Sequence, residues 1–99
     1  MRYRIEITEE AESDLDGIRV FYREEILDRL EEHLRYEPTR ESRSRIKRLV
    51  LLNSPAYRLR VGDYRVFYDV DDVTAEVVVL RVMGKEESLM YLAKLEQMR

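Results

Sequence analysis

Residues 57–72 read YRLRVGDYRVFYDVDD, and this stretch holds two alternating runs separated by a two-residue turn. In each run apolar side chains occupy every second position, which is the pattern of a strand with one buried face. Gly62 and Asp63 suit a type II′ turn, or a type I′ turn if Asp63 also has a positive φ angle. The stretch therefore predicts a β-hairpin.

The two-residue turn fixes the register of this hairpin. Counting back across the turn places Arg60 directly opposite Arg65, and Arg58 opposite Phe67. These side chains share the face that points away from the apolar residues Tyr57, Leu59, Val66 and Tyr68. Like charges directly opposite each other on a sheet are destabilising. We therefore expect this face either to meet carboxylates from elsewhere in the fold or to bind an anion.

Composition predicts one ordinary domain over residues 1–99, because 44% hydrophobic residues in 99 suffice for a single core. The absence of cysteine excludes disulfides, thiolate zinc sites and cysteine nucleophiles. His33 is the only histidine, and on a charged helix it is expected to be a surface residue, so no metal or cofactor is predicted. No apolar run is long enough to span a bilayer and the first ten residues do not resemble a signal peptide, so a cytoplasmic location is expected.

The net charge of −3 hides a basic centre, because residues 38–65 carry eight basic and only two acidic side chains. Such a stripe favours phosphate backbones or an acidic protein segment as partners. An alternative is that these are solvated loop positions without a ligand. The candidate RNA-binding residues of the first half of this stretch are Arg43, Arg45, Lys47 and Arg48.

The rest of the chain predicts an α+β fold. We expect an N-terminal strand at 2–8, a helical hairpin that breaks near 16–19, a strand at 46–52, the hairpin, an apolar strand at 76–83 and a short helix at 86–98. Hairpin-linked strands after a helical hairpin indicate an antiparallel sheet of about four strands.

This order, with YRLRVGDYRVFYDV followed by VVVLRVMGK, resembles the RelE/ParE family of toxins from type II toxin-antitoxin modules, which include plasmid stabilisation systems. The RelE branch, which we favour, implies an mRNA interferase, a ribosome-dependent endoribonuclease that needs no metal. The matching positions for its activity are Arg58, Arg60 and Arg65, with Lys85 or Tyr91 in proton transfer and Arg81 as a further RNA-binding residue. The resemblance also implies an antitoxin as partner, in a toxin-antitoxin hetero-oligomer, beside the ribosome and mRNA.

The chain departs from the RelE pattern at two positions. Glu86 stands where that pattern has an arginine, with Lys85 as the nearest cation, and Tyr91 lies one residue closer to Gly84 than expected. Two other functions therefore stay open. One is a toxin of the ParE branch, which inhibits DNA gyrase without cleaving RNA, and the other is a module that binds an antitoxin and does nothing else.

Overall fold

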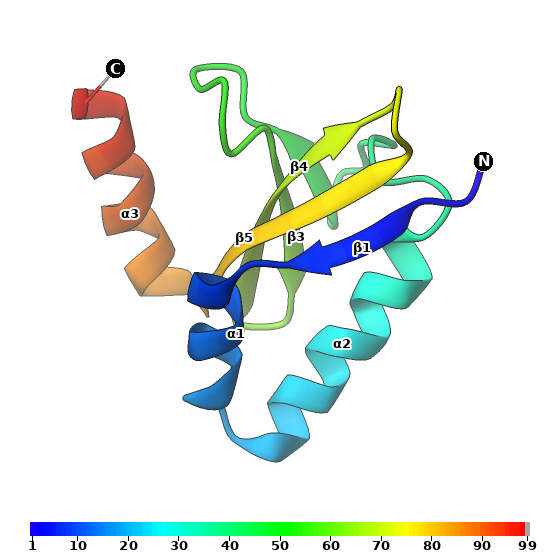
Figure 1. The fold of residues 1–99 in the computed structure, drawn as a ribbon. Coiled ribbons are helices and arrows are strands. Elements are labelled where there is room, and N and C mark those ends of the chain that lie inside the picture. The colour runs from blue at the N-terminus through cyan, green and yellow to red at the C-terminus, as the bar shows by residue number, and fades with distance from the viewer. Residues whose placement is uncertain (99) are drawn as a thin grey trace.

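The computed structural model describes residues 1–98, which form a five-stranded sheet and three helices (Figure 1). The elements are β1 (Arg4–Ile7), α1 (Glu9–Asp16), α2 (Val20–Leu34), β2 (Ile46–Arg48), β3 (Tyr57–Val61), β4 (Tyr64–Asp71), β5 (Glu76–Gly84) and α3 (Lys85–Met98). The predicted α+β class and the order of its elements are confirmed.

The four strands after the helical hairpin form the predicted antiparallel sheet, and β1 adds a parallel strand at its edge, so the whole sheet is mixed. Its strand order is β1-β5-β4-β3-β2, and β1 pairs parallel with β5 while all other neighbours are antiparallel. A parallel pair needs a long crossover, and here most of the chain separates the two strands. The pairing therefore has no local turn signal from which it can be predicted.

The hairpin at the centre of the sheet has the predicted register. Arg60 lies opposite Arg65 and Arg58 opposite Phe67. Gly62 has a φ angle of 55°, and Ala75 is the one non-glycine residue of 1–98 with a positive φ, so the turn is of the II′ kind. A side chain at Gly62 would strain the turn, because L-residues rarely adopt this backbone conformation.

The helical hairpin also breaks where the sequence predicted it. Helix α1 ends at Asp16 and α2 begins at Val20, with Gly17 between them. At the other end of α1 the hydroxyl of Thr8 accepts a hydrogen bond from the Ala11 N–H, which caps the helix. Strand β2 is shorter than the predicted 46–52, because the chain turns away after Arg48 and leaves Val50 and Leu51 exposed.

One face of the sheet packs against α1 and α2 and forms the core, whereas α3 lies on the opposite side (Figure 1). The buried core residues include Ala11, Leu15, Ile26, Leu30, Leu34, Leu59, Val66, Tyr68, Val77 and Val79. We call the opposite face, which carries Arg58, Arg60, Arg65 and Phe67, the outer face. Within residues 1–98 no helix has the length and apolar character needed to cross a membrane.

Candidate functional site

Three arginines of the β3–β4 hairpin form the centre of the outer face, and we call Arg58, Arg60 and Arg65 the arginine cluster. Their positions follow from the register, which places Arg60 and Arg65 side by side on neighbouring strands. Arg65 is only 7% exposed, Arg58 is half-buried and Arg60 is exposed. Exposure to solvent therefore increases within the cluster from Arg65 through Arg58 to Arg60.

The Arg65 guanidinium is held by the turn itself. Its Nη1 donates hydrogen bonds to the carbonyl oxygens of Gly62 and Tyr64, each at 2.9 Å. Burial lowers the pKa of Arg65, the charge of Arg60 lowers it further, and nearby Asp63 offsets part of this effect. The group stays charged at neutral pH because arginine titrates far above it.

Arg58 has a buried donor without an acceptor. Its Nε is shielded from solvent and makes no hydrogen bond within the described part of the chain. Burial lowers the pKa of Arg58, and the charges of Arg65 and Arg60 lower it further. A buried donor left unpaired costs about 1–3 kcal/mol. Because this Nε is shielded from solvent, a bound anion would offset the cost through its attraction to the guanidinium charge rather than through a hydrogen bond to Nε.

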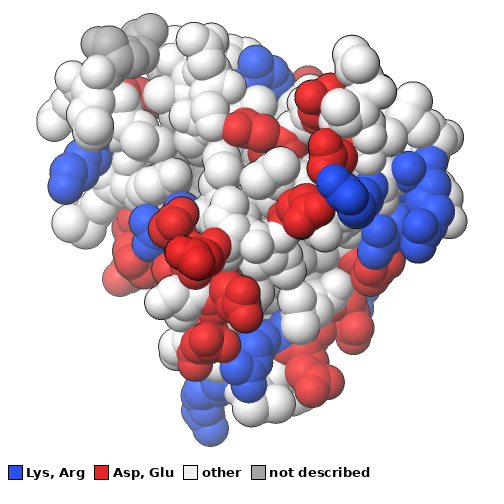
Figure 2. Space-filling view, in the orientation of Figure 1, with Lys and Arg blue, Asp and Glu red and all other residues white. Residues whose placement is uncertain are grey.

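No carboxylate of residues 1–98 forms an ion pair with the arginine cluster. Among residues 1–98 the ion pairs involve other arginines and none of these three. The acidic side chains instead gather elsewhere, and Figure 2 shows several of them over α1. Of the two expectations for this face, the structure therefore favours anion binding over internal neutralisation.

A row of side chains crosses the outer face through Arg58. Lys47 lies directly opposite Arg58 on β2 and is exposed, while Phe67 lies opposite on β4 and is fully buried. Arg81 follows on β5, opposite Phe67. Lys47 thus extends the cationic surface toward the sheet edge. Phe67 is a buried apolar residue on the other side of Arg58.

Arg81 is on the same face as Arg58, but its charge is already paired. Its Nε and Nη2 donate to the two carboxylate oxygens of Asp14 at 2.7 and 3.1 Å. Its guanidinium carbon lies 5.5 Å from the centre of the Tyr91 ring. The role of Asp14 could not be predicted from the sequence, because 67 residues separate it from Arg81.

Tyr91 reaches the outer face from α3, and Lys85 lies at the start of that helix beside the β3–β4 turn. The Tyr91 ring lies 5.1 Å from that of Phe67. Burial raises the pKa of the Tyr91 phenol, and the charge of Arg81 opposes part of the rise. Lys85 is exposed at the start of α3, and its backbone N–H donates to the Asp63 carbonyl at 2.8 Å. Glu86 follows it, exposed, in a hollow shared with Tyr64.

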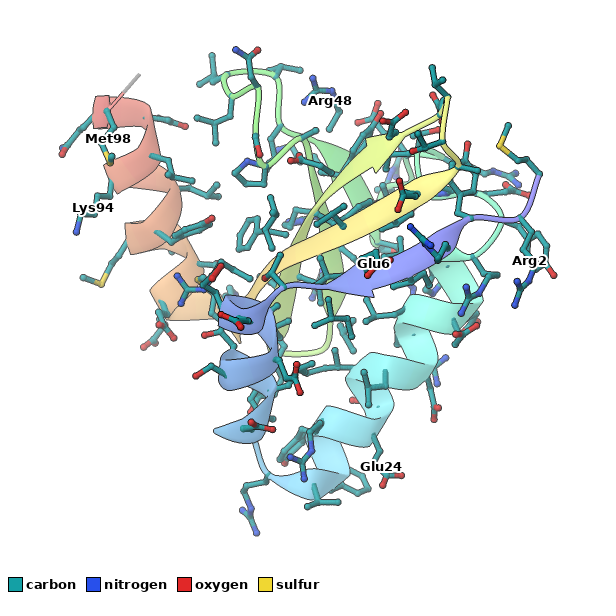
Figure 3. All side chains as sticks on the ribbon, in the orientation of Figure 1. Arg2, Glu6, Glu24, Arg48, Lys94 and Met98 are labelled. Carbon is teal, nitrogen blue, oxygen red and sulfur yellow. The ribbon has the colours of Figure 1, made fainter. Side chains whose placement is uncertain are left out.

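The other predicted RNA-binding residues do not join the cluster. Arg43 is exposed in the loop before β2, and Arg45 lines a separate hollow beside His33 at the end of α2. Arg48 donates to the carbonyls of Leu49 at 2.9 Å and Ala56 at 2.7 Å. Figure 3 shows it at the end of the sheet away from the β3–β4 turn. Lys47 is therefore the one of these four next to Arg58.

His33 is half-buried on α2, and its Nε2 has no hydrogen-bond partner in residues 1–98. Burial lowers the pKa of the imidazole. The nearest carboxylate, Glu32, is 3.9 Å away. The described part of the chain holds no group of three metal-binding side chains.

Comparisons with known proteins agree on one family. A model of the ParE toxin of type II toxin-antitoxin systems matches residues 5–89. No curated protein matches the chain in sequence.

Similar solved structures come from toxin-antitoxin complexes and from an isolated toxin. A chain of the RelBE2 toxin-antitoxin complex from Mycobacterium tuberculosis is 28% identical, with a TM-score of 0.68 over 85% of this chain and 99% of that chain. The isolated RelE toxin of E. coli is 22% identical, with a TM-score of 0.65 over 98% of this chain and 99% of that chain. A chain of the RelE-RelB complex from Pyrococcus horikoshii is 23% identical, with a TM-score of 0.62 over 86% and 97%. The last two show likeness of fold alone.

Proposed function

The chain belongs to the RelE/ParE superfamily of toxins from type II toxin-antitoxin systems, and on this premise we propose that it is an mRNA endoribonuclease acting in the ribosome. The observation that carries the proposal is the unneutralised arginine cluster, with the orphaned Nε of Arg58 at its centre. A phosphodiester is the anion that such guanidinium donors bind well. This target would place the protein in the cytoplasm.

The reaction that we propose is attack by a ribose 2′-oxygen on the adjacent phosphorus. The new P–O2′ bond forms as the P–O5′ bond breaks, the 2′-hydroxyl loses its proton and the 5′-oxygen gains one. Negative charge concentrates on the phosphoryl oxygens in the transition state. Arg58 and Arg65, already fixed by the sheet, would stabilise that charge more than the charge of the substrate. Arg60 and Lys47 are exposed beside them and would bind the flanking phosphates.

Tyr91 is the better placed of the two candidates for proton transfer. It packs on Phe67, which lies opposite Arg58. A tyrosine phenol is protonated at neutral pH, so Tyr91 can donate a proton to the leaving 5′-oxygen. Burial raises the pKa of Tyr91 and so weakens it as an acid, and the charge of Arg81 opposes part of this effect. Lys85, exposed at the start of α3, is the alternative donor.

The test is a reconstituted translation system to which the purified protein is added. The 5′ ends of the mRNA are then mapped by primer extension. New ends at codons held by the ribosome support the nuclease, whereas an intact mRNA overturns it.

The second candidate function is inhibition of DNA gyrase without RNA cleavage. Two observations favour it, since the matching family model is that of the ParE toxin and Glu86 places a repulsive charge at the start of α3. A supercoiling assay with purified gyrase tests it directly. Loss of supercoiling together with intact mRNA would select this function, and neither effect would leave a module that only binds an antitoxin.

Glu86→Arg is expected to increase the rate of mRNA cleavage about tenfold at low salt. The substitution replaces a carboxylate that repels phosphate by a cation, and a tenfold change corresponds to about 1.4 kcal/mol. Since Glu86 is exposed, screening should reduce the gain as salt is raised. The cleavage rate is measured at two salt concentrations.

Glu24→Arg is the matched control, because Glu24 is exposed on α2, away from α3 (Figure 3). It makes the same change in net charge and should leave cleavage within about twofold of the unmodified protein. Equal gains in both variants would show that net charge, rather than the position of Glu86, limits the rate.

An antitoxin is the partner that we propose, because several of the structural neighbours are toxin-antitoxin complexes. The outer face offers what an acidic, partly helical segment needs. It has the unpaired charges of the arginine cluster, and exposed apolar side chains lie beside it at Leu51, in a hollow shared with Lys47, and at Met90, in a hollow shared with Arg81. Such a complex would cover the proposed active site and hold the toxin inactive.

Binding of the cognate antitoxin is expected to weaken at least about tenfold between 50 and 500 mM salt, because surface charges are screened over this range. Isothermal titration calorimetry at several salt concentrations measures the slope. Arg60→Ala should reduce the slope, since this residue is exposed and forms no ion pair within residues 1–98. An affinity independent of salt would show that the contact is mainly apolar.

A further inference from the structure

Asp14, Arg81 and Tyr91 form a bridge that connects α1 to α3 across β5. Arg81 donates two hydrogen bonds to the Asp14 carboxylate, at 2.7 and 3.1 Å. The same guanidinium lies over the Tyr91 ring, at 5.5 Å. The ring in turn packs against Phe67, at 5.1 Å. A continuous chain of contacts therefore runs from α1 to the Phe67 ring, which lies beside Arg58.

Asp14 is itself fixed at the edge of the sheet. The backbone N–H of Val82 donates to its Oδ2 at 2.9 Å, and its side chain is only 18% exposed. A carboxylate held in this way determines the plane of a guanidinium that binds both its oxygens. The orientation of Arg81 over Tyr91 is thus set from α1.

Tyr91 is one of the side chains that hold α3 to the sheet. Ser88 is the one buried residue of the described helix, Tyr91, Leu92 and Leu95 are half-buried, and Leu89 and Met90 are exposed. Tyr91 packs on Phe67 of the outer face. What fixes this ring therefore helps to hold α3 against the outer face.

We propose that Asp14 is a positioning residue of the site, and that it acts through Arg81 to hold the Tyr91 phenol beside the arginine cluster. Arg81 then orients the proton donor, because its charge is paired with Asp14 and two of its five N–H donors are used by that carboxylate. The catalytic consequence rests on the proposed function. The geometric consequence does not, because it concerns only the place of the Tyr91 ring.

Asp14→Asn is the first test. Asparagine keeps the shape and one acceptor for the Val82 N–H but cannot accept both hydrogen bonds from Arg81. Asp16→Asn is the matched control, because it removes the same charge from the same helix at an exposed carboxylate 3.8 Å from Arg23. Arg81→Lys is a second variant that keeps the positive charge and loses the two-point contact.

The first readout needs no RNA. In protein with labelled aromatic rings, the nuclear Overhauser effect between Tyr91 and Phe67 should fall at least about twofold in Asp14→Asn and Arg81→Lys. Amide exchange in α3 should become about tenfold faster in both variants. Asp16→Asn should change neither quantity. An unchanged Tyr91–Phe67 effect in Asp14→Asn would overturn the inference whether or not the protein cleaves RNA.

The second readout separates positioning from binding. On mRNA-programmed ribosomes kcat should fall about tenfold in Asp14→Asn and Arg81→Lys, with KM within about twofold of the unmodified protein. A rise in KM at constant kcat would instead make Arg81 a phosphate contact and overturn the inference. If the unmodified protein does not cleave mRNA, the proposed function fails, and the ring measurement alone decides the role of Asp14.

Discussion

Arg65→Ala is expected to reduce mRNA cleavage by about 100-fold to 1000-fold, which is the effect of removing one preorganised donor to a developing negative charge. Arg65 is almost fully buried, and two hydrogen bonds to the turn fix its guanidinium before any substrate arrives. The conformational entropy of the Arg65 side chain is therefore lost during folding, so ordering this side chain does not add to the activation free energy. Primer extension in reconstituted translation measures the loss.

The fold should survive this substitution. The two carbonyls that lose a hydrogen bond belong to Gly62, an exposed turn residue, and to Tyr64, which is half-buried beside the turn. The variant also removes the like charge directly opposite Arg60. An unchanged urea midpoint together with lost cleavage is the expected pair of results.

Two control variants define what Arg65 supplies. Arg65→Lys keeps the charge but lacks the fork of donors, so it should recover only part of the rate. Arg43→Ala removes an exposed loop cation outside the cluster and should change the rate by less than about threefold. Full activity in Arg65→Ala would show that the arginine cluster is not the active site.

The local parts of this site could be predicted from the sequence. Gly62 and Asp63 set a tight turn, and alternation on both sides of it placed Arg60 opposite Arg65, as the structure shows. Gly17 marked the break in the helical hairpin. Each of these features depends on neighbours within a few residues, so the sequence pattern contains the relevant interaction.

The remaining parts depend on contacts between distant residues. The parallel pairing joins Arg4 to Glu76, and the Asp14–Arg81 contact joins α1 to β5. Neither contact has a spacing in the sequence that marks it. The length of β2 was overestimated for another reason, because apolar character alone does not distinguish a buried strand from the exposed Val50 and Leu51.

The basic segment before the hairpin shows how far alternation alone reaches. Ile46 is buried in the core, so Lys47 points to the outer face beside Arg58 and Arg48 points away from it. Strand alternation was therefore sufficient to separate Lys47 from Arg48. The prediction that all four basic residues bind RNA followed from their charge alone. Charge does not indicate which face of the sheet a side chain occupies.

Arg58→Met is expected to stabilise the protein and inactivate it at once. Methionine fills a similar length of apolar space without the orphaned Nε and without repulsion from Arg60 and Arg65. Replacing an unpaired buried polar group by an apolar one should raise the free energy of unfolding by about 1 kcal/mol. Cleavage should fall about 100-fold, because a guanidinium aimed at the phosphate is lost.

Urea unfolding and primer extension on the same preparation measure the two effects of Arg58→Met together. Arg40→Met is the control, because Arg40 is exposed and pairs with Glu37 at 2.8 Å, so its loss should lower the free energy of unfolding only slightly. Opposite signs in the two variants would identify Arg58 as a residue kept for an anion at the expense of stability. A destabilised Arg58→Met would show that the fold itself depends on this guanidinium, and the anion site would then lose its physical basis.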